Sequence, residues 1–402
     1  MMSVEVRRRA TRVVEKPIWM VCTTHMFVEV FLLTQVALIP VIVREFQLSL
    51  LEASLVAAVP SLVALFMNIP SGLLADRVSA NRLLFIAMTI EGLSALLVSR
   101  SSSFWGLLVA LSFMQIASPL YHASGLTQVT RIARREHLSM AMGLHNALGN
   151  LGSGAGVVSL AILLSLGWRW AYLLWAVPML IWGVTILMSP RLTITGSGRQ
   201  RDGSASSSSS TSSVFGYALL IFLIVISIRE VGSTSITTFM TTYLVKSRNV
   251  SESIASLIFG SGPFVGIIGS LVGGYIGIRV GTKKALIWAI LGSAVSLSIL
   301  GLLTDTTSLT LTFLVYAFFG YAVWSPLNAL MAEITPLATR GLGYSIVLFV
   351  DGLMSSVTPL LAAGVIELLG IWVIFPFSVA FLVASVFVLQ LLDHPHRQRA
   401  PS

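Results

Sequence analysis

The chain has 402 residues, of which 55% are hydrophobic and 10% charged, whereas a soluble globular protein carries about 25% charged residues. This composition excludes an ordinary soluble protein and predicts a chain that is mostly embedded in a lipid bilayer. Its one cysteine, Cys22, excludes an intramolecular disulfide, and the net charge of +9 indicates either nucleic-acid binding or membrane topology, depending on where the charges lie.

Two sets of six apolar segments follow one another along the chain. After a basic tail (1–17) with no cleavable signal peptide, an N-terminal half (18–189) contains segments near 18–43, 50–75, 82–99, 103–131, 139–166 and 168–189. A serine-rich stretch (190–213) predicts a cytoplasmic linker. A C-terminal half (214–392) contains segments near 214–246, 252–278, 284–303, 309–334, 341–366 and 370–392, before a tail (393–402). We therefore predict an all-α membrane protein with twelve transmembrane helices in two six-helix halves.

The distribution of positive charge predicts the orientation of these helices. Most of the 25 lysines and arginines fall in the tails and loops on the side of the N-terminus; the exceptions are Arg44, Arg100, Arg169, Lys246 and Arg248 in the opposite loops and Arg229 within a helix. The positive-inside rule then places both termini in the cytoplasm. We expect a multi-pass protein of the inner (plasma) membrane, a monomer, whose basic tail sets topology and does not bind nucleic acid.

The loop after the second predicted helix recurs in the second half. It begins Gly72-Leu-Leu-Ala-Asp76-Arg77 and ends with Arg82, and Gly274 and Arg279 stand at the matching places about 200 residues later. An offset of about half the chain indicates that the two halves are duplicated.

This loop resembles the signature between helices 2 and 3 of the major facilitator superfamily. The resemblance implies two pseudo-symmetric halves that rock about a central site, with a cytoplasmic gate latched by Gly72, Asp76, Arg77, Arg82, Gly274 and Arg279. Glycine at position 72 would let helices approach closely, and we expect Asp76 to dock near Arg340. The sequence departs from the signature at Ser79, Asn81 and Ile278. The alternative is that Asp76 and Arg77 are solvated loop charges that set topology.

Few ionisable residues lie at bilayer depth, where each is a candidate for function because charge is costly there. His25 and Glu29 are four residues apart, so they share one helix face and can pass a proton between them. They are the first candidate for proton coupling; the alternative is a buried pair that holds this helix to a neighbour. Asp351 and Glu230 are further candidates for proton coupling.

The second half carries one arginine inside a predicted helix. Arg229 could bind an anionic group of a small-molecule substrate bidentately, and because Glu230 is its direct neighbour we expect the two side chains to point in different directions. The alternative for Arg229 is a structural ion pair with Glu29 or Asp351.

Four polar residues of the first half are predicted to line a substrate site: Tyr121 and His122 in the fourth helix, and His145 and Asn146 in the fifth. A histidine in a helix bundle can equally be a hydrogen-bonded spacer. Glu91 falls in a helix that is peripheral in the fold implied above, so we expect a structural role for it. Gly149, Gly152, Gly154 and Gly156 predict a small-residue packing face.

Several short motifs together are similar to the fosmidomycin-resistance-like branch of the superfamily. They are His25-Met-Phe-Val-Glu29, Tyr121-His122-Ala-Ser, Gly149-Asn-Leu-Gly152 and Thr241-Thr-Tyr-Leu244 after Arg229; Glu29 stands where that branch has aspartate, and Ala123 where it has proline. The similarity implies proton-driven export of a small polar or anionic compound.

We therefore expect a secondary active transporter that works by alternating access, with protons, a small solute and the bilayer as its partners. Proton-coupled uptake, an uncoupled facilitator and a non-transporting sensor remain alternatives. The sequence has no nucleotide-binding loop, no metal-ligand cluster and no activated nucleophile, so we expect no enzymatic activity, cofactor or metal.

Overall fold

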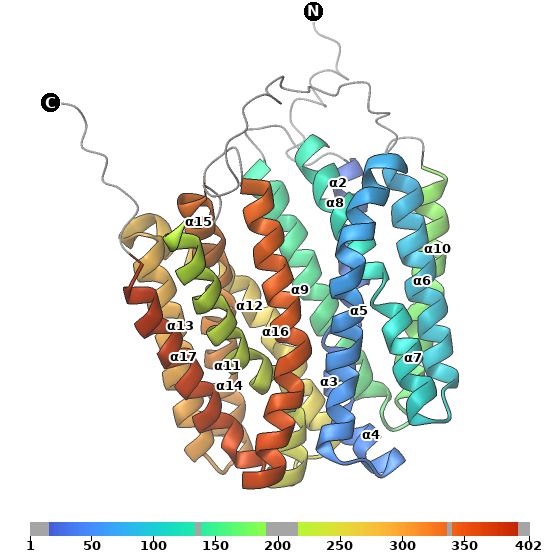
Figure 1. Cartoon of the computed structure of the whole chain (residues 1–402). Coiled ribbons are helices and arrows are strands. Elements are labelled where there is room, and N and C mark those ends of the chain that lie inside the picture. Colours follow the sequence, from blue (N-terminus) through green and yellow to red (C-terminus); the bar gives the residue numbers. More distant parts are fainter. Residues whose placement is uncertain (1–15, 133–137, 190–215, 336–339, 393–402) are drawn as a thin grey trace, which may run out of the picture. The chain divides into compact units, whose positions relative to one another are not determined.

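A computed structural model describes residues 16–132, 138–189, 216–335 and 340–392, and the described chain is helical, without β-strands (Figure 1). Twelve stretches of it are long and apolar enough to cross a membrane. The predicted number of spans and their places in the sequence are therefore confirmed. The predicted linker (190–213) and the tail (393–402) lie outside the described residues, as does most of the tail at 1–17.

The helices form two compact units. The first comprises Met1–Gln35 and Val63–Thr195, and the second Val36–Leu62 and Gly196–Ser402. The first unit contains α2 (Lys16–Glu29), most of α5 (Leu50–Arg77), α6 (Ala80–Arg100), α7 (Phe104–Met114), α8 (Ala117–Ile132), α9 (Leu138–Leu163) and α10 (Arg169–Leu187). Here α6 packs against α10, α8 and α7, while α2 packs against α9 and α8.

The second unit contains the C-terminal helices and a segment from the N-terminal part of the sequence. Its helices are α4 (Ile39–Phe46), the start of α5, α11 (Tyr217–Arg248), α12 (Glu252–Val280), α13 (Thr282–Leu302), α14 (Thr306–Ala322), α15 (Trp324–Ile334), α16 (Arg340–Leu369), η4 (Ile371–Val373) and α17 (Ile374–Gln390). The short α3 (Thr34–Ala37) lies at the boundary. An ion pair of 2.9 Å between Arg44 and Glu252 joins α4 to α12, and α4 also packs against α11.

Three of the predicted spans are interrupted in the structure. The first breaks after Glu29, where residues 30–33 form a turn, the fourth breaks at Gln115 and Ile116, and the tenth breaks at Val323. Two of these breaks have the same cause. Pro119 and Pro326 have no N–H to donate to the carbonyls four residues earlier, so the helical ladder is interrupted just before them.

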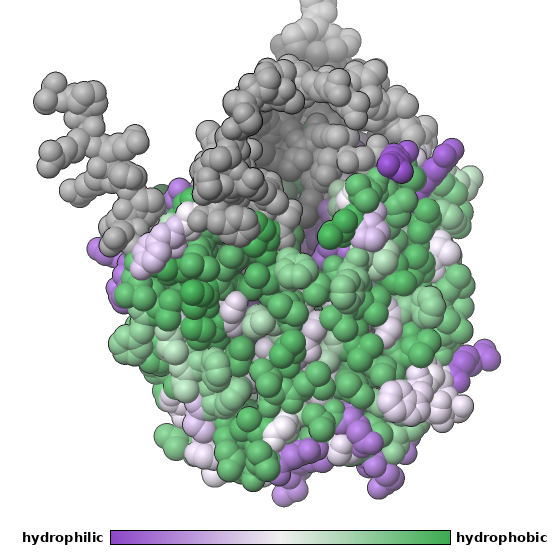
Figure 2. Space-filling model, in the orientation of Figure 1, coloured by the Kyte–Doolittle hydropathy of each residue, from purple (hydrophilic) through white to green (hydrophobic). Residues whose placement is uncertain are grey.

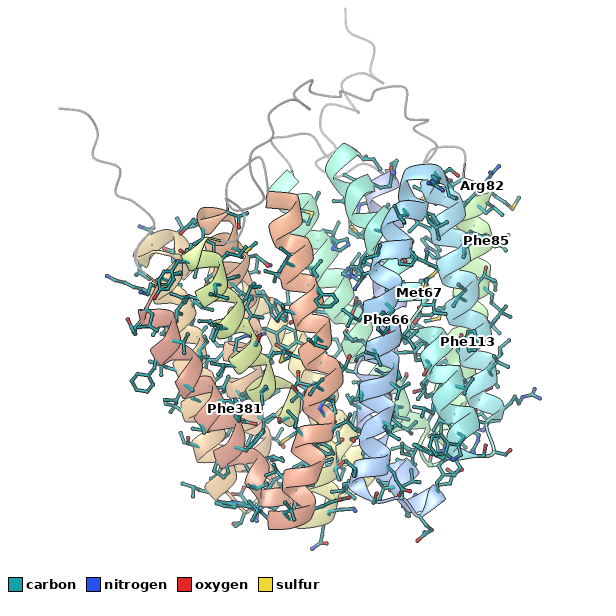
Figure 3. All side chains as sticks on the ribbon, in the orientation of Figure 1. Phe66, Met67, Arg82, Phe85, Phe113 and Phe381 are labelled. Carbon is teal, nitrogen blue, oxygen red and sulfur yellow. The ribbon has the colours of Figure 1, made fainter. Side chains whose placement is uncertain are left out.

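Apolar side chains cover the long sides of the helices, and hydrophilic residues gather near the helix ends (Figure 2). Phe113, which is 54% exposed, points outward from the end of α7, whereas Arg82 lies at the start of α6 among the polar residues (Figure 3). Exposed apolar side chains along the spans are stable in contact with lipid tails but not with water, as the composition predicts.

Candidate functional site

The site in the first unit is built on the contact between α2 and α9. A Cβ added to Gly149 would overlap the ring of His25, and one added to Gly152 would overlap the carbonyl of Met26. Gly156 meets the carbonyl of Val30 in the same way. The predicted small-residue face is confirmed at these three positions, and it allows the ring of His25 to lie directly against α9.

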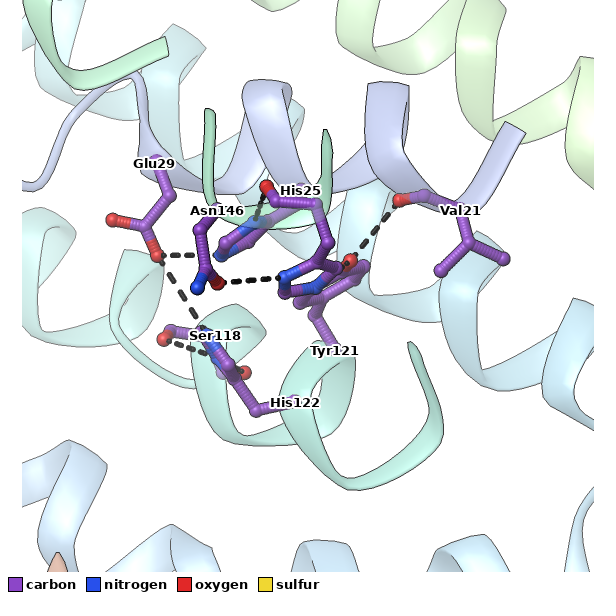
Figure 4. Close-up of polar contacts among 8 residues, drawn as sticks. Val21, His25, Glu29, Ser118, Tyr121, His122 and Asn146 are labelled. Carbon is purple, nitrogen blue, oxygen red and sulfur yellow. Dashed lines mark hydrogen bonds and ion pairs between the residues drawn. The ribbon is translucent and has the colours of Figure 1, made fainter. Parts of the chain in front are cut away.

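The side chains of two histidines approach the carboxylate of Glu29, the last residue of α2 (Figure 4). Its Oε1 lies 3.4 Å from Nε2 of His25 and 3.8 Å from Nε2 of His122. The side chain of His25 is 9% exposed, that of Glu29 14% and that of His122 36%. The predicted pairing of His25 with Glu29 is present, and His122, which we had placed with the substrate-binding residues, joins it as a third member. We call these three residues the His–Glu cluster.

The other nitrogen of each imidazole is held by the backbone. Nδ1 of His25 lies 2.8 Å from the carbonyl oxygen of His145, and Nδ1 of His122 lies 2.9 Å from that of Ser118. A carbonyl oxygen only accepts hydrogen bonds, so both Nδ1 atoms carry hydrogen. In a neutral ring the Nε2 atom then carries a lone pair and no hydrogen. Both of these Nε2 atoms face the Glu29 carboxylate.

Tyr121 and His145 lie behind the His–Glu cluster. The Tyr121 hydroxyl donates to the carbonyl of Val21 at 3.0 Å and lies 2.9 Å from Nε2 of His145. The ring of His145 stacks on that of His25 at 3.8 Å between centroids. Both residues are fully buried. We had predicted that they line a substrate site, but in this structure they pack behind His25 and position it. Asn146 is exposed next to them.

The cluster also bears comparison with a metal site, since its three ligand-type atoms lie within 4.8 Å of one another. Neighbouring ligands of tetrahedral zinc are about 3.3 Å apart, because Zn–N and Zn–O distances are about 2.0–2.2 Å. Glu29 meets this spacing with His25 but not with His122, and no fourth histidine, cysteine or acidic residue of the described chain joins the group. The geometry does not assign a metal here.

The second unit holds a buried ion pair between adjacent residues of α11. The guanidinium of Arg229 donates from Nη2 to the carboxylate of Glu230, and from Nη1 to the hydroxyl of Ser233 at 3.3 Å. Our expectation that the two side chains point in different directions is wrong. Neighbouring residues start about 100° apart on a helix, but two long side chains can bend toward each other, and burial favours any arrangement that pairs their charges.

The surroundings of this pair also come from neighbouring helices. Trp324 lies at the break between α14 and α15. The centroid of its ring is 5.3 Å from the guanidinium carbon of Arg229. Nε of Arg229 has no hydrogen-bond partner among the described residues. Asp351 of α16 is acted on electrostatically by both Glu230 and Arg229. The candidates Arg229, Glu230 and Asp351 thus belong to one charged group within the second unit.

Most of the predicted gate residues are exposed. Arg77 ends α5 and Arg82 lies in the first turn of α6, and among the described residues no atom lies within 4 Å of a Cβ built at Gly72. The close helix approach that we expected at Gly72 stays a prediction. Gly274 makes an ordinary contact with Ser325, and Arg279 lies 5.2 Å from the ring of Tyr275.

Asp76 and Asn81 are the remaining residues of the predicted gate loop. The side chains of Asp76 and Arg340 lie outside what the structure describes, so their docking stays a prediction. Asn81, where the superfamily signature has a basic residue, donates from Nδ2 to the carbonyls of Ile186 and Ser189 at 3.0 and 2.8 Å. It therefore caps the end of α10.

Sequence reasoning missed the environment of Glu91. This residue of α6 lies on a small cavity together with Glu29, Gln115 and Ser118. A signal for the cavity was present in the sequence, because the predicted segment 103–131 is longer than one span needs and contains Pro119. A break in this helix could have been inferred from those two facts.

Comparison with known proteins gives relatives over most of the chain. The fosmidomycin resistance protein of Escherichia coli (strain K12) is 22% identical over 318 residues, which cover 78% of this chain and 76% of that protein. Among solved structures, a bacterial homologue of the human lysosomal transporter Spinster, inward-facing and unoccupied, has a TM-score of 0.73 at 15% identity and covers 94% of this chain and 96% of that chain.

The nucleoside transporter NupG has a TM-score of 0.78 at 12% identity and covers 93% of this chain and 99% of that chain. At these identities the solved structures show the fold alone. The family model of the major facilitator superfamily matches residues 21–250 and again residues 222–402. These two matches cover nearly the whole described chain, and they agree with the twelve spans and with the repeat of the signature loop. The chain therefore belongs to the major facilitator superfamily, a family of membrane transporters and not of enzymes.

Proposed function

We propose that this protein is a proton-coupled exporter of a small polar or anionic solute, and that the His–Glu cluster binds the coupling proton. The observation that carries the proposal is the convergence of two imidazole Nε2 atoms on one carboxylate oxygen. With both Nδ1–H groups donated to backbone carbonyls, three acceptors would face one another if no proton lay between them.

A proton at either Nε2 removes this repulsion. It turns the contact with Glu29 into a charge-assisted hydrogen bond, which is stronger than a neutral one. Glu29 also lies at the carbonyl end of α2, where the helix dipole favours positive charge. Gain and loss of the proton change the attraction between α2 and α8, and this gives a physical link between proton binding and helix movement.

The solute side of the proposal rests on Arg229. Its guanidinium is buried, already binds one carboxylate and leaves Nε unpartnered among the described residues. An anionic group of a solute can compete with Glu230 for the Arg229 guanidinium. The Asp351 and Glu230 carboxylates nearby can then bind protons. Export as the direction is supported by the similarity to the fosmidomycin resistance protein.

The test is proton flux in everted membrane vesicles that carry a pH-sensitive dye, with phosphonates, carboxylates, sugars and cationic drugs added in turn. We expect a solute-dependent proton flux in the native protein and its loss in Glu29→Gln, while exchange of labelled solute across the membrane continues. Glu52→Gln, which changes an exposed carboxylate in the same way, is the matched control and keeps the flux.

Other outcomes contradict parts of the proposal. Solute movement without proton flux in the native protein would indicate a facilitator, and flux that survives in Glu29→Gln would remove the His–Glu cluster as the proton site. Loss of flux on addition of a chelator, with recovery on addition of zinc, would assign the cluster to a metal. Accumulation of solute in the opposite direction would indicate uptake.

A further inference from the structure

Glu91 is a buried acidic residue, and its described surroundings offer no structural reason for an acidic side chain at this position. It lies in the middle of α6, is 3% exposed, and its Oε2 has no hydrogen-bond partner among the described residues. Among the described residues a carboxylate in this position would have no counter-charge, so the protonated form of Glu91 is favoured. Buried polar atoms without partners are rare in proteins and often mark a function.

The cavity that Glu91 faces is shared with Glu29. Its lining consists of Val28, Glu29, Phe31, Leu32, Glu91, Met114, Gln115 and Ser118. It has room for about one water molecule. Both helix breaks of the first unit open onto it, since Glu29 ends α2 and Gln115 separates α7 from α8. Helix breaks free backbone carbonyls, which gives a water at this point acceptors in addition to the two carboxyl groups.

The charges around the cavity are unbalanced on the Glu91 side. None of its lining residues is a lysine, arginine or histidine. Four helices pack against α6, namely α2, α7, α8 and α10. Their titratable residues are Lys16, Cys22, His25 and Glu29 on α2, Tyr121, His122 and Arg131 on α8, and Arg169 and Tyr172 on α10, with none on α7. Among those whose side chains the structure describes, Glu29 is the one that lines the cavity.

Two carboxyl groups that face one small cavity cannot both be ionised without a large repulsion. Glu29 has histidines on its other side to stabilise its negative charge, whereas no described histidine, lysine or arginine lines the cavity beside Glu91. The favourable arrangement therefore keeps a proton on Glu91 and the negative charge on Glu29.

We propose that Glu91 is a second proton-binding residue of the transport cycle, which exchanges its proton with Glu29 through the cavity between them. The Glu91 carboxylic acid donates its proton to a water, and the same water gives a proton to the Glu29 carboxylate, so Glu91 becomes ionised and Glu29 neutral. The proposal rests on the proposed function, because it needs Glu29 to gain and lose a proton. Ser118, which also lies 3.3 Å from Nδ1 of His122, connects the cavity to the His–Glu cluster.

Infrared difference spectroscopy of the purified full-length protein tests the resting state. Protonated carboxyl groups give a C=O stretching band that ionised ones lack. We expect such a band in native protein without solute, a loss of part of its intensity in Glu91→Gln and no loss in Glu29→Gln. If the band is absent from the native protein, or keeps its full intensity in Glu91→Gln, Glu91 does not hold the proton and the proposal fails.

Transport by the same variants tests the role in the cycle. We expect Glu91→Gln to slow proton-driven transport by about 100-fold, within the range for loss of a proton-transfer group, while solute exchange without net proton movement keeps its rate and its KM. Glu91→Asp, which keeps a carboxyl group, should restore part of the proton-driven rate. An equal loss of exchange and proton-driven transport in Glu91→Gln would indicate a merely structural role and overturn the proposal.

Failure of the two proposals can be told apart. If the native protein shows no solute-dependent proton flux, the proposed function fails, whatever the infrared band shows. If the flux is present and depends on Glu29 but is unchanged in Glu91→Gln, only the inference about Glu91 fails.

Discussion

His25 and His122 each use one ring nitrogen for a backbone carbonyl, and this fixes which nitrogen faces Glu29. The groups that hold His25 are themselves held by further contacts. His145 provides the carbonyl that holds His25, and Tyr121 in turn contacts the ring of His145. A network of this kind rigidifies its members only while every donor and acceptor in it is satisfied.

Tyr121→Phe should therefore destabilise the protein. The substitution leaves the carbonyl of Val21 and Nε2 of His145 without their buried partner, and an unsatisfied buried polar group costs about 1–3 kcal/mol. The measurement is unfolding of the purified protein in detergent, followed by circular dichroism.

Tyr172→Phe provides the control for that substitution. Tyr172 is also fully buried, but its hydroxyl has no partner among the described residues, so removal of the hydroxyl should leave stability unchanged or raise it slightly. Equal losses in the two variants would mean that the Tyr121 hydrogen bonds contribute nothing.

The candidate site residues could be selected from the sequence because ionisable groups are rare in apolar helices, so each one stands out there. Their partners could not be predicted in the same way. The pairing of Arg229 with Glu230 depends on the conformations of two long side chains, and the joining of His122 to Glu29 depends on how α8 packs against α2. The cavity beside Glu91 could not be predicted, because cavities result from packing.

At the scale of the helix, proline and glycine decide where side chains can be placed. Pro119 and Pro326 stand at comparable places in the two halves, and each is preceded by a break. One break opens beside Glu29 and Glu91, and the other places Trp324 over Arg229. The His–Glu cluster and the Arg229–Glu230 pair therefore each lie next to an interrupted helix, a common arrangement at the binding sites of transporters.

Gly152→Ala should disrupt the packing of α2 on α9. The added Cβ would overlap the backbone carbonyl of Met26, which cannot move without the helix, and such overpacking costs about 1–3 kcal/mol. Gly143→Ala in the same helix is the control, since no described atom lies within 4 Å of a Cβ there. That change should stabilise the helix by up to about 1 kcal/mol. Thermal unfolding of both variants gives the comparison, and a loss of stability in Gly143→Ala but not in Gly152→Ala would contradict the packing described above.

Asp305, at the start of α14, contributes to the stability of the folded protein in a way that depends on pH. Its carboxylate accepts a hydrogen bond from the backbone N–H of Ser308 at 2.8 Å, and this bond holds the pKa of Asp305 below its ordinary value. A lowered pKa in the folded state means that the contribution is present above the ordinary pKa and is lost as the pH falls through the lowered one.

The melting temperature of Asp305→Ala should therefore fall below that of the native protein at neutral pH, and the gap should close in acid. Asp305→Asn retains an acceptor for the Ser308 N–H, so its difference from the native protein should be smaller at neutral pH. A gap that is the same at all pH values would show that the Asp305 charge has no part in capping.

The spans themselves could be predicted to within a few residues at most ends, because a bilayer of fixed thickness demands a fixed length of apolar helix. The interruptions were missed because hydropathy averaged over a segment does not change where the helix breaks. Proline positions would have indicated two of the three. For the turn at residues 30–33 the sequence offers no proline, and we have no local account of it.

At the scale of the whole chain, the sequence repeat predicts a division into two halves at the serine-rich stretch. The contacts group the helices in a related but different way, because residues 36–62 pack with the C-terminal helices. The ion pair of Arg44 with Glu252 and the hydrogen bond from the Leu51 N–H to Glu367 at 3.0 Å contribute to this packing. Contacts of this kind depend on tertiary structure and leave no pattern in the N-terminal sequence.

Helix α5 contributes residues to both units. This helix runs without interruption from Leu50 to Arg77, yet its residues up to Leu62 belong to one unit and those from Val63 to the other. No loop interrupts α5 where the chain passes from one unit to the other. Pro60 has no N–H to donate, so the backbone ladder of α5 lacks one hydrogen bond close to this change of unit and is weakened there.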